Sequence, residues 1–332
     1  MSLSIKDVAL RAGCSIATVS RVLAGKGYIG GDTRQKVEEA VKALGYRPNR
    51  VARSLRAAKS RVIGLILSDI CNPFFSEISR AVEHVAIRHG YSVLICNADE
   101  DPAKEAHYLQ LMEEEKVAGI LLSPTRSIAK ALDFSKFPPL ALFDRKFPKA
   151  QMDSVVIDNE DAAFRLTRTL IEGGYRNIAG VFGAKSYTAG VRIAGFKAAF
   201  EGVEDRMQGV HQAPAFEVEG RRLMQEILEL RPAVDAVLCS SALLATGAYQ
   251  ALRERGLRMP DQMGFACFDD PPWAGFVDPS VTVIRQPASA IGEAAAELLM
   301  KRIADPTRVV SEIVLQGELI ERGSSRRGGG VY

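Results

Sequence analysis

The chain has 332 residues, enough for two or three domains with a sizeable core. Hydrophobic residues make up 47% and charged residues 25%, which is ordinary for a globular protein. No apolar run approaches the roughly 20 residues that cross a bilayer, and no apolar stretch typical of a secretory signal stands at the N-terminus. These features exclude an integral membrane protein and predict a cytoplasmic one.

Charge is unevenly distributed along the chain. The first 60 residues contain 12 Lys and Arg against 4 Asp and Glu, whereas the net charge of the whole chain is only +3. A strongly basic segment is typical of a surface that faces phosphates, with a solvated basic face as the alternative. The five cysteines and four histidines lack metal-ligand spacing, so we expect no metal, no cofactor and reduced thiols.

Two short helices joined by a tight turn are predicted for residues 5–23. Ile5 and Val8 share an apolar face in the first helix. Gly13 follows, where only glycine reaches positive φ without steric cost, and Ser15 can cap the second helix. This is the helix-turn-helix pattern, whose second helix enters the DNA major groove. A helical hairpin inside a core is the alternative.

A third helix is predicted for residues 33–44, with Asp32 as its cap and Gly45 at its end. Three small helices would form a compact headpiece. Residues 50–56 carry three arginines and three apolar residues, too few for a helix that is stable alone. We therefore expect this segment to order only on a partner.

From residue 61 onward, the pattern changes to alternating strands and helices. Strands are predicted at 61–67, 91–96, 118–122, 140–143, 155–157, 178–182, 234–238, 265–268 and 313–315. Helices are predicted at 73–89, 102–116, 161–171, 191–200, 220–230, 243–255 and 288–303. Two successive α/β units predict two doubly wound lobes, with a ligand cleft at the carboxyl ends of the strands.

The motifs IKDVALRAG, TVSRVL, TRQKVEEAVKALGYRPN and RVARSLR lie within residues 4–60. Together they resemble the headpiece and hinge of the LacI/GalR family of bacterial repressors, and the resemblance continues to about residue 322. It implies an all-α helix-turn-helix headpiece and an α/β core of two doubly wound lobes, similar to a periplasmic sugar-binding protein. The expected domains are a headpiece (1–46), a hinge helix and linker (47–60), a first lobe (61–157 with 287–313), a second lobe (158–286 with 314–322) and a disordered tail (323–332).

The resemblance implies a homodimer that binds a palindromic DNA operator, since dimer symmetry is mirrored in the DNA. In this family a hinge leucine wedges into the central base step from the minor groove, and Leu55 is the matching position, with a core leucine as the alternative. Ile16 and Ala17 hold base-reading positions beside Arg21, where apolar side chains favour thymine methyl groups. The residues expected to contact DNA are Ser4, Ser15, Ile16, Ala17, Thr18, Ser20, Arg21, Tyr46, Asn49, Arg50, Arg53 and Leu55.

This sequence departs from the family pattern at several positions. Ala24 and Gly30 stand where many members have an asparagine and a serine that contact phosphate. Ser241 and Ala242 replace an asparagine and an aspartate in the second lobe. The first pair puts two phosphate contacts in doubt, and the second weakens the case for a plain neutral sugar.

The resemblance places a small-molecule effector between the lobes. The residues expected to contact it are Phe74, Phe75, Ser123, Arg126, Asp144, Ser186, Thr188, Arg192, Phe216, Ser241 and Asp269. Asp69 and Thr125 lie on the same predicted loops. For both of them, and for Asp144, a structural role is an equal alternative. For Arg192 and Asp269 the alternative is a salt bridge between lobes or a helix cap.

The charges on these loops suggest the class of effector. Ala242 lacks a carboxylate that would repel an anion, and Arg192, Lys185 and Arg126 lie near the expected cleft. Guanidinium groups bind carboxylates and phosphates through charge-assisted hydrogen bonds. This favours a sugar acid or sugar phosphate, although Asp269 argues for hydroxyl donors.

Signatures of enzymes are missing from the sequence. It contains no phosphate-binding Gly-x-x-x-x-Gly-Lys-Ser/Thr loop, no dinucleotide fingerprint after a strand and no Gly-x-Ser-x-Gly elbow. The sequence therefore predicts a ligand-responsive transcriptional repressor and not an enzyme. The alternative is a solute-binding protein or a sugar-acting enzyme with an appended helical domain.

The wedge interpretation of Leu55 is testable. We expect Leu55→Ala to lower the affinity for specific operator DNA and to leave thermal unfolding without DNA nearly unchanged, because the hinge is unsupported without DNA. Gel shifts and melting curves measure the two effects. A marked drop in melting temperature without DNA would instead identify Leu55 as a core residue.

Overall fold

The computed structural model describes residues 4–24, 29–46, 60–125, 136–147, 151–184, 186–231 and 233–328. The chain divides into two compact units, Met1–Ser60 and Arg61–Tyr332. We call the first unit the headpiece and the second the core. Of the predicted hinge and linker, 47–60, residues 47–59 lie outside the described residues.

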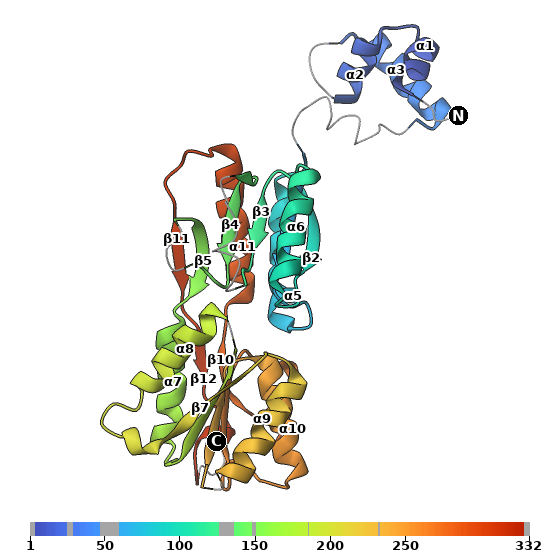
Figure 1. Cartoon of the computed structure of the whole chain (residues 1–332). Helices are drawn as coiled ribbons and strands as arrows, with labels where there is room; N and C mark the ends of the chain where they lie inside the picture. The colour runs from blue at the N-terminus through green and yellow to red at the C-terminus, as the bar shows by residue number, and fades with distance from the viewer. Residues whose placement is uncertain are drawn as a thin grey trace. The chain divides into compact units, whose positions relative to one another are not determined.

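Three helices form the headpiece: α1 (Ile5–Ala12), α2 (Ile16–Ala24) and α3 (Gly31–Leu44) (Figure 1). Each contributes one fully buried valine to a small common core, namely Val8, Val19 and Val37. Gly13 and Gly45 end α1 and α3 with φ of 63° and 61°, as predicted. The helical spacing of apolar residues is thus enough to specify this unit.

The two predicted helix caps in the headpiece have different outcomes. The Ser15 hydroxyl accepts a hydrogen bond from the Thr18 N–H at 3.1 Å, which confirms it as the cap of α2. Asp32 is not the cap of α3, because the helix begins at Gly31 and Gly30 holds the cap position. Asp32 lies in the first turn instead, where its carboxylate still interacts favourably with the helix dipole.

Two six-stranded sheets form the core, in two lobes joined end to end (Figure 1). The first sheet has the order β11 (Glu312–Leu315), β5 (Asp153–Ile157), β4 (Leu140–Phe143), β3 (Ile120–Leu122), β1 (Val62–Leu67) and β2 (Ser92–Asn97), all parallel. The second has the order β12 (Glu318–Ile320), β10 (Thr282–Arg285), β9 (Gly264–Phe268), β8 (Ala236–Cys239), β6 (Ile178–Gly183) and β7 (Met207–Ala213), with β12 antiparallel.

Helices cover both faces of each sheet. The first sheet has α5 (Pro73–Arg88), α6 (Pro102–Glu114) and α11 (Ala288–Ala304), of which α5 and α11 pack together. The second has α7 (Asn159–Glu172) and α8 (Tyr187–Ala198) on one side, with α9 (Glu217–Leu230) and α10 (Ala242–Glu254) on the other (Figure 1). Because β1 pairs with both β2 and β3, and β6 with both β7 and β8, each sheet reverses its winding direction there. Doubly wound sheets bind ligands at the carboxyl ends of such strands.

The chain passes between the lobes three times, after β5, after β10 and after β11. The predicted boundary between 313 and 314 is wrong. All four residues of β11 pair with β5, from Glu312 beside Ser154 to Leu315 beside Ile157, so that boundary would cut a strand. The third crossing therefore follows Leu315.

Three strands of the second sheet were not predicted: β7, β10 and β12. β12 is only three residues long, and β7 is a half-buried edge strand, so neither presents the continuous apolar run of a central strand. None of the described helices is both long and apolar enough to cross a membrane.

The C-terminal segment contradicts the prediction of a disordered tail at 323–332. Residues 323–328 are ordered against the second lobe, whereas 329–332 lie outside the described residues. Ser324 is fully buried; its hydroxyl donates to the Phe265 carbonyl at 2.5 Å and accepts from the Thr282 N–H at 2.9 Å. The Arg327 guanidinium lies over the Tyr175 ring, 4.8 Å from its centroid. Small polar residues here therefore complete the sheet's hydrogen bonds and do not form a free tail.

We expect Ser324→Ala to lower the free energy of unfolding by about 1–3 kcal/mol, because it leaves the buried Thr282 N–H without its acceptor. Denaturant titration of the full chain measures the loss. Arg326→Ala, at an exposed position in the same segment, is the matched control and should change stability by no more than about 0.5 kcal/mol. Equal stability of Ser324→Ala and the parent would show that the segment contributes little.

Candidate functional site

The second helix of the headpiece presents a mixed face to solvent. On α2, Val19 points inward and is fully buried, whereas Ile16, Ala17 and Arg21 are exposed. Thr18 and Ser20 are half-buried beside them. The predicted base-reading residues therefore share one accessible face, as a recognition helix requires.

Ser4 and Tyr46 take part in the headpiece's own structure. The Ser4 N–H and hydroxyl both donate to the Asp7 carboxylate, at 2.7 and 2.8 Å, at the start of α1. Tyr46 is half-buried against the headpiece core. Among the other residues predicted to contact DNA, four lie outside the described residues: Asn49, Arg50, Arg53 and Leu55.

A cavity of about 500 Å³ lies between the two lobes of the core. Nine of the eleven predicted effector residues line it: Phe74, Phe75, Asp144, Ser186, Thr188, Arg192, Phe216, Ser241 and Asp269. Ser123 is buried just behind the wall, and Arg126 lies outside the described residues. The loops after the strands thus meet at one place, as the topology predicts.

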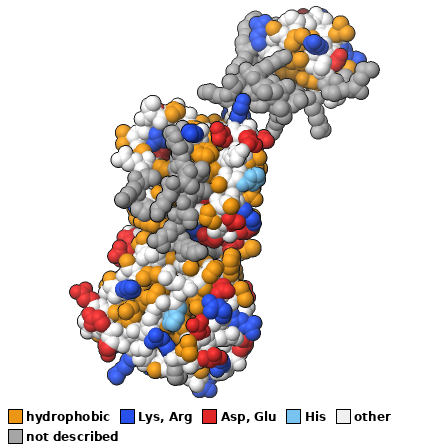
Figure 2. Space-filling model, in the orientation of Figure 1, with side chains coloured by type: hydrophobic (Ala, Val, Ile, Leu, Met, Phe, Trp, Pro, Cys, Tyr) orange, Lys and Arg blue, Asp and Glu red, His pale blue; other side chains and the backbone are white. Residues whose placement is uncertain are grey.

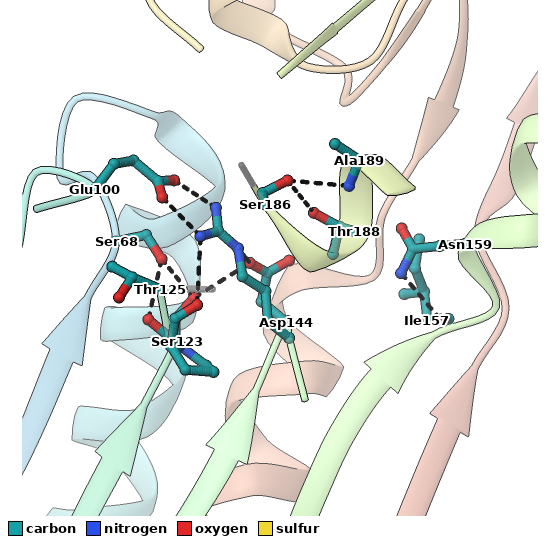
Figure 3. Close-up of polar contacts among 12 residues, drawn as sticks. Ser68, Glu100, Ser123, Thr125, Asp144, Ile157, Asn159, Ser186, Thr188 and Ala189 are labelled. Carbon is teal, nitrogen blue, oxygen red and sulfur yellow. Dashed lines mark hydrogen bonds and ion pairs between the residues drawn. The ribbon is translucent and has the colours of Figure 1, made fainter. Parts of the chain in front are cut away.

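Hydrogen bonds between neighbouring strand ends build the first-lobe wall (Figure 3). The Ser68 and Ser123 hydroxyls lie 2.7 Å apart, and the Ser123 hydroxyl donates to Asp144 at 3.2 Å. These three residues follow β1, β3 and β4. Burial raises the pKa of Asp144, while Arg145 and Arg192 oppose that rise.

An ion pair that the sequence did not predict closes this wall. Arg145, almost fully buried, donates to both carboxylate oxygens of Glu100, at 2.5 and 2.8 Å. The planar guanidinium fits a carboxylate in this two-point geometry. The pair joins the loops after β2 and β4, so it holds the first-lobe wall together without a ligand.

Arg192 holds the second-lobe wall to the crossing segments. From α8 it donates to the Asn159 side chain at 2.7 Å, the Ser240 carbonyl at 2.6 Å and the Gln286 side chain at 3.2 Å. Its guanidinium also lies over the Phe268 ring, 3.9 Å from the centroid. Asn159 and Gln286 follow β5 and β10, where the chain crosses between lobes.

Asp269, the carboxylate on the second-lobe wall, is held by neutral groups. Asp269 accepts from the Ala242 N–H at 3.0 Å and from the Gln286 amide at 2.6 Å. Because Ala242 is the first residue of α10, the Asp269 charge lies at a helix N-terminus, which stabilises it. Ser241 caps the same helix, its hydroxyl accepting from the Leu244 N–H at 3.4 Å. Small side chains at 241 and 242 therefore leave Asp269 anchored and the cavity open.

Backbone strain is concentrated around this cavity. Asp99, Glu100, Asp144 and Asp269 all line it, and all have positive φ, between 53° and 68°. Lys116 is the only other non-glycine residue with positive φ in the described parts of the chain. Such conformations cost energy and cluster at functional sites.

The described lining is acidic. It contains five carboxylates against two guanidinium groups, Arg145 and Arg192. Three of the carboxylates are already in ion pairs, Glu100 and Asp144 with Arg145 and Asp99 with Lys104, and Arg192 is bonded to protein partners. Figure 2 shows acidic side chains gathered on the core where the lobes meet. Lys185 lies outside the described residues. This charge balance favours a ligand rich in hydrogen-bond donors over an anion.

Sequence reasoning missed several residues of the site, among them Glu100, Asn159 and Gln286. Gln286 follows β10, a strand that was not predicted. Asn159 lies two residues after the end of β5, at a position assigned to a crossing and not to a wall. Glu100 lies four residues beyond the end of the strand predicted at 91–96, in the loop after that strand, and a search of every such loop for charged residues could have found it.

Two family models match the chain. "Bacterial regulatory proteins, lacI family" matches residues 4–49, and "Periplasmic binding proteins and sugar binding domain of LacI family" matches residues 60–322. The chain belongs to the LacI family. Members of this family are DNA-binding regulators, so the predicted headpiece, the two-lobed core and the non-enzymatic function are confirmed.

Relatives of this LacI-family chain match along its whole length. The ribose operon repressor of Halalkalibacterium halodurans is 36% identical and covers 98% of each chain. The HTH-type transcriptional repressor CytR of Escherichia coli is 33% identical, over 97% of this chain and 96% of the relative. Among solved structures, the complex of the transcriptional regulator CelR with cellobiose is 27% identical, with a TM-score of 0.72 over 97% of this chain and 99% of the other. The Lac repressor dimer bound to operator, 24% identical over 98% and 100% of the chains, shares the fold with a TM-score of 0.87.

We expect Arg192→Ala in this LacI-family regulator to lower the free energy of unfolding without effector by on the order of 3 kcal/mol, because it removes a buried cation and leaves its partners unpaired. Lys197→Ala, at an exposed position on the same helix, is the matched control. Denaturant titration compares the two. Unchanged stability of Arg192→Ala would show that Arg192 serves only the ligand.

Proposed function

We propose that this LacI-family chain is a cytoplasmic repressor that binds a palindromic operator as a homodimer and responds to a neutral, polyhydroxylated sugar in the cavity of the core. The observation that carries the effector class is the acidic lining. Carboxylates accept hydrogen bonds from hydroxyl groups and repel carboxylates and phosphates. The described residues therefore favour a neutral sugar over the sugar acid or sugar phosphate that the sequence suggests.

The walls offer complementary surfaces for such a ligand. Phe74 and Phe75 from the first lobe and Phe216 from the second supply apolar faces. Asp144 and Asp269 supply acceptors from opposite lobes. Small-molecule sites typically combine an apolar lining with a few well-placed polar groups. The names of relatives also support a neutral sugar, since one is a ribose operon repressor and another is a regulator in complex with cellobiose.

Control of DNA binding follows from the placement of Arg192. A ligand changes DNA affinity only if it prefers one arrangement of the lobes. A sugar held between Asp144 and the Arg192–Asp269 side touches residues that are bonded to the crossing segments at Asn159 and Gln286. Its binding would thus bias the angle between lobes, and through the first lobe the spacing of the two hinges in a dimer.

Matched ligands test the effector class. We expect D-ribose to raise the melting temperature of the full chain and to bind more tightly than D-ribonate or D-ribose 5-phosphate in calorimetric titrations. Asp144→Asn should weaken ribose binding, and the exposed Asp205→Asn should not. Tighter binding of either anion would reject the neutral-sugar proposal.

A gel shift with palindromic operator DNA, with and without ribose, tests whether ribose binding changes the affinity for DNA.

A further inference from the structure

A second, smaller pocket lies between the two lobes beside the effector cavity. Its volume is about 80 Å³. Phe74, Asp269 and Gln286 line both the second pocket and the cavity, so the two adjoin. Glu77 from the first lobe and Arg285 from the second line the second pocket and not the cavity. Two opposite charges on different lobes therefore share one narrow pocket, and the function described so far uses neither.

The charge on the second lobe is held in place by that lobe. Arg285, the last residue of β10, donates to Asp270 from Nε at 3.1 Å and from Nη2 at 2.6 Å, and its Nη1 donates to Glu318 at 3.4 Å. Asp270 is fixed in turn by two bonds from Arg322, at 2.8 and 2.9 Å. A guanidinium has more N–H groups than these bonds use. The Arg285 side chain is also 49% exposed, so it is anchored and still open to a further acceptor.

The charge on the first lobe has no such anchor. Glu77 is exposed on α5, one turn after Phe74, and its carboxylate makes no hydrogen bond or ion pair with the other described residues. Its charge nevertheless acts across the second pocket. The hydrogen bond to Asp270 is the largest influence that raises the pKa of Arg285, and the negative charges of Glu318 and Glu77 raise it further. Glu77 and Arg285 thus attract each other without a bond between them.

We propose that Glu77 and Arg285 are an electrostatic latch between the lobes, which forms an ion pair when an effector draws the lobes together. An effector held by Asp144 on one lobe and Asp269 on the other narrows the space between the lobes, and the second pocket shares that space. A pair that forms in only one arrangement of the lobes shifts the balance toward that arrangement. Because neither charge lines the effector cavity, the latch acts on closure and not on the ligand. This inference rests on the proposed sugar-binding function.

The exposure of the two side chains sets the size of the effect. Ion pairs between exposed side chains stabilise a structure only slightly, and added salt weakens them. We expect the latch to raise the population of the closed arrangement, and with it the affinity for the effector, by about threefold. A neutral sugar has no charge for salt to screen, so a salt dependence of its binding reports on the charges of the protein.

Calorimetric titration of the full chain with D-ribose, at about 50 mM and about 500 mM NaCl, tests the latch. We expect the parent to bind about threefold more weakly at high salt. Glu77→Gln should bind about threefold more weakly than the parent at low salt and show little salt dependence. Glu77→Lys, which places like charges face to face, should weaken binding about tenfold. Glu83→Lys, the same charge change at another exposed position on α5, is the matched control and should bind within about twofold of the parent.

A double-mutant cycle tests whether Arg285 is the partner of Glu77. In an Arg285→Ala background, Glu77→Lys should leave the affinity nearly unchanged, because the charge that repels the new lysine is gone. Asp270 keeps both of its bonds to Arg322 in that background, so this part of the second lobe remains held. The latch is overturned if Glu77→Gln binds like the parent at both salt concentrations, or if the effects of Glu77→Lys and Arg285→Ala simply add.

A cross-link without ligand separates the latch from the proposed function. Arg285→Lys keeps the positive charge and supplies an amine, which a carbodiimide joins to a carboxylate in direct contact. Because the two charges attract each other without a ligand, peptide mass spectrometry should find position 285 joined to Glu77 as well as to Asp270, the bonded neighbour that serves as internal control. If ribose binds no variant, the ribose-type effector fails and the cross-link decides. A product with Asp270 and none with Glu77 overturns the latch.

Discussion

A single buried guanidinium ties the parts of the core together. Arg192 is fixed by bonds to Asn159, Ser240 and Gln286, which come from three different strand ends. Burial lowers the pKa of Arg192, while Asp269 and Asp144 oppose that shift and keep the charge in place. A buried cation is tolerated only with such partners. The second-lobe wall, the crossing segments and the position of Asp269 all depend on this arrangement.

The same arrangement explains how a binding cavity becomes a regulatory one. Two of the partners of Arg192, Asn159 and Gln286, lie where the chain crosses between lobes, so under the proposed function a ligand that contacts Arg192 would act on the crossing segments. The opposite wall is held separately by the Glu100–Arg145 pair and the Ser68–Ser123–Asp144 bonds. Two walls that are each rigid and joined by only three crossings can move as units. That is the kind of two-state element that ligand control requires.

Much of the site followed from local sequence rules. Phe74 and Phe75 lie in the first turn of α5, Ser186 caps α8 and Ser241 caps α10. Their positions are therefore set by where each strand ends and the next helix begins. The carboxyl-end rule then brought them to one cavity. It failed for Gln286 because β10, the strand before it, is short and was not predicted. It failed for Ser324 because small polar residues at a chain end look like a tail unless the sheet that needs their hydrogen bonds is known.

The sequence by itself determined the helix-turn-helix headpiece, the alternation of strands and helices and the membership of the LacI family, because these rest on periodicity and motifs within short segments. Only the tertiary structure decided the charge of the cavity and the use of its arginines. The carboxylates that surround Arg192 and Arg145 come from loops far apart in the chain. Whether a guanidinium is free for an anion or already bonded depends on which loops meet it, and no local pattern records that.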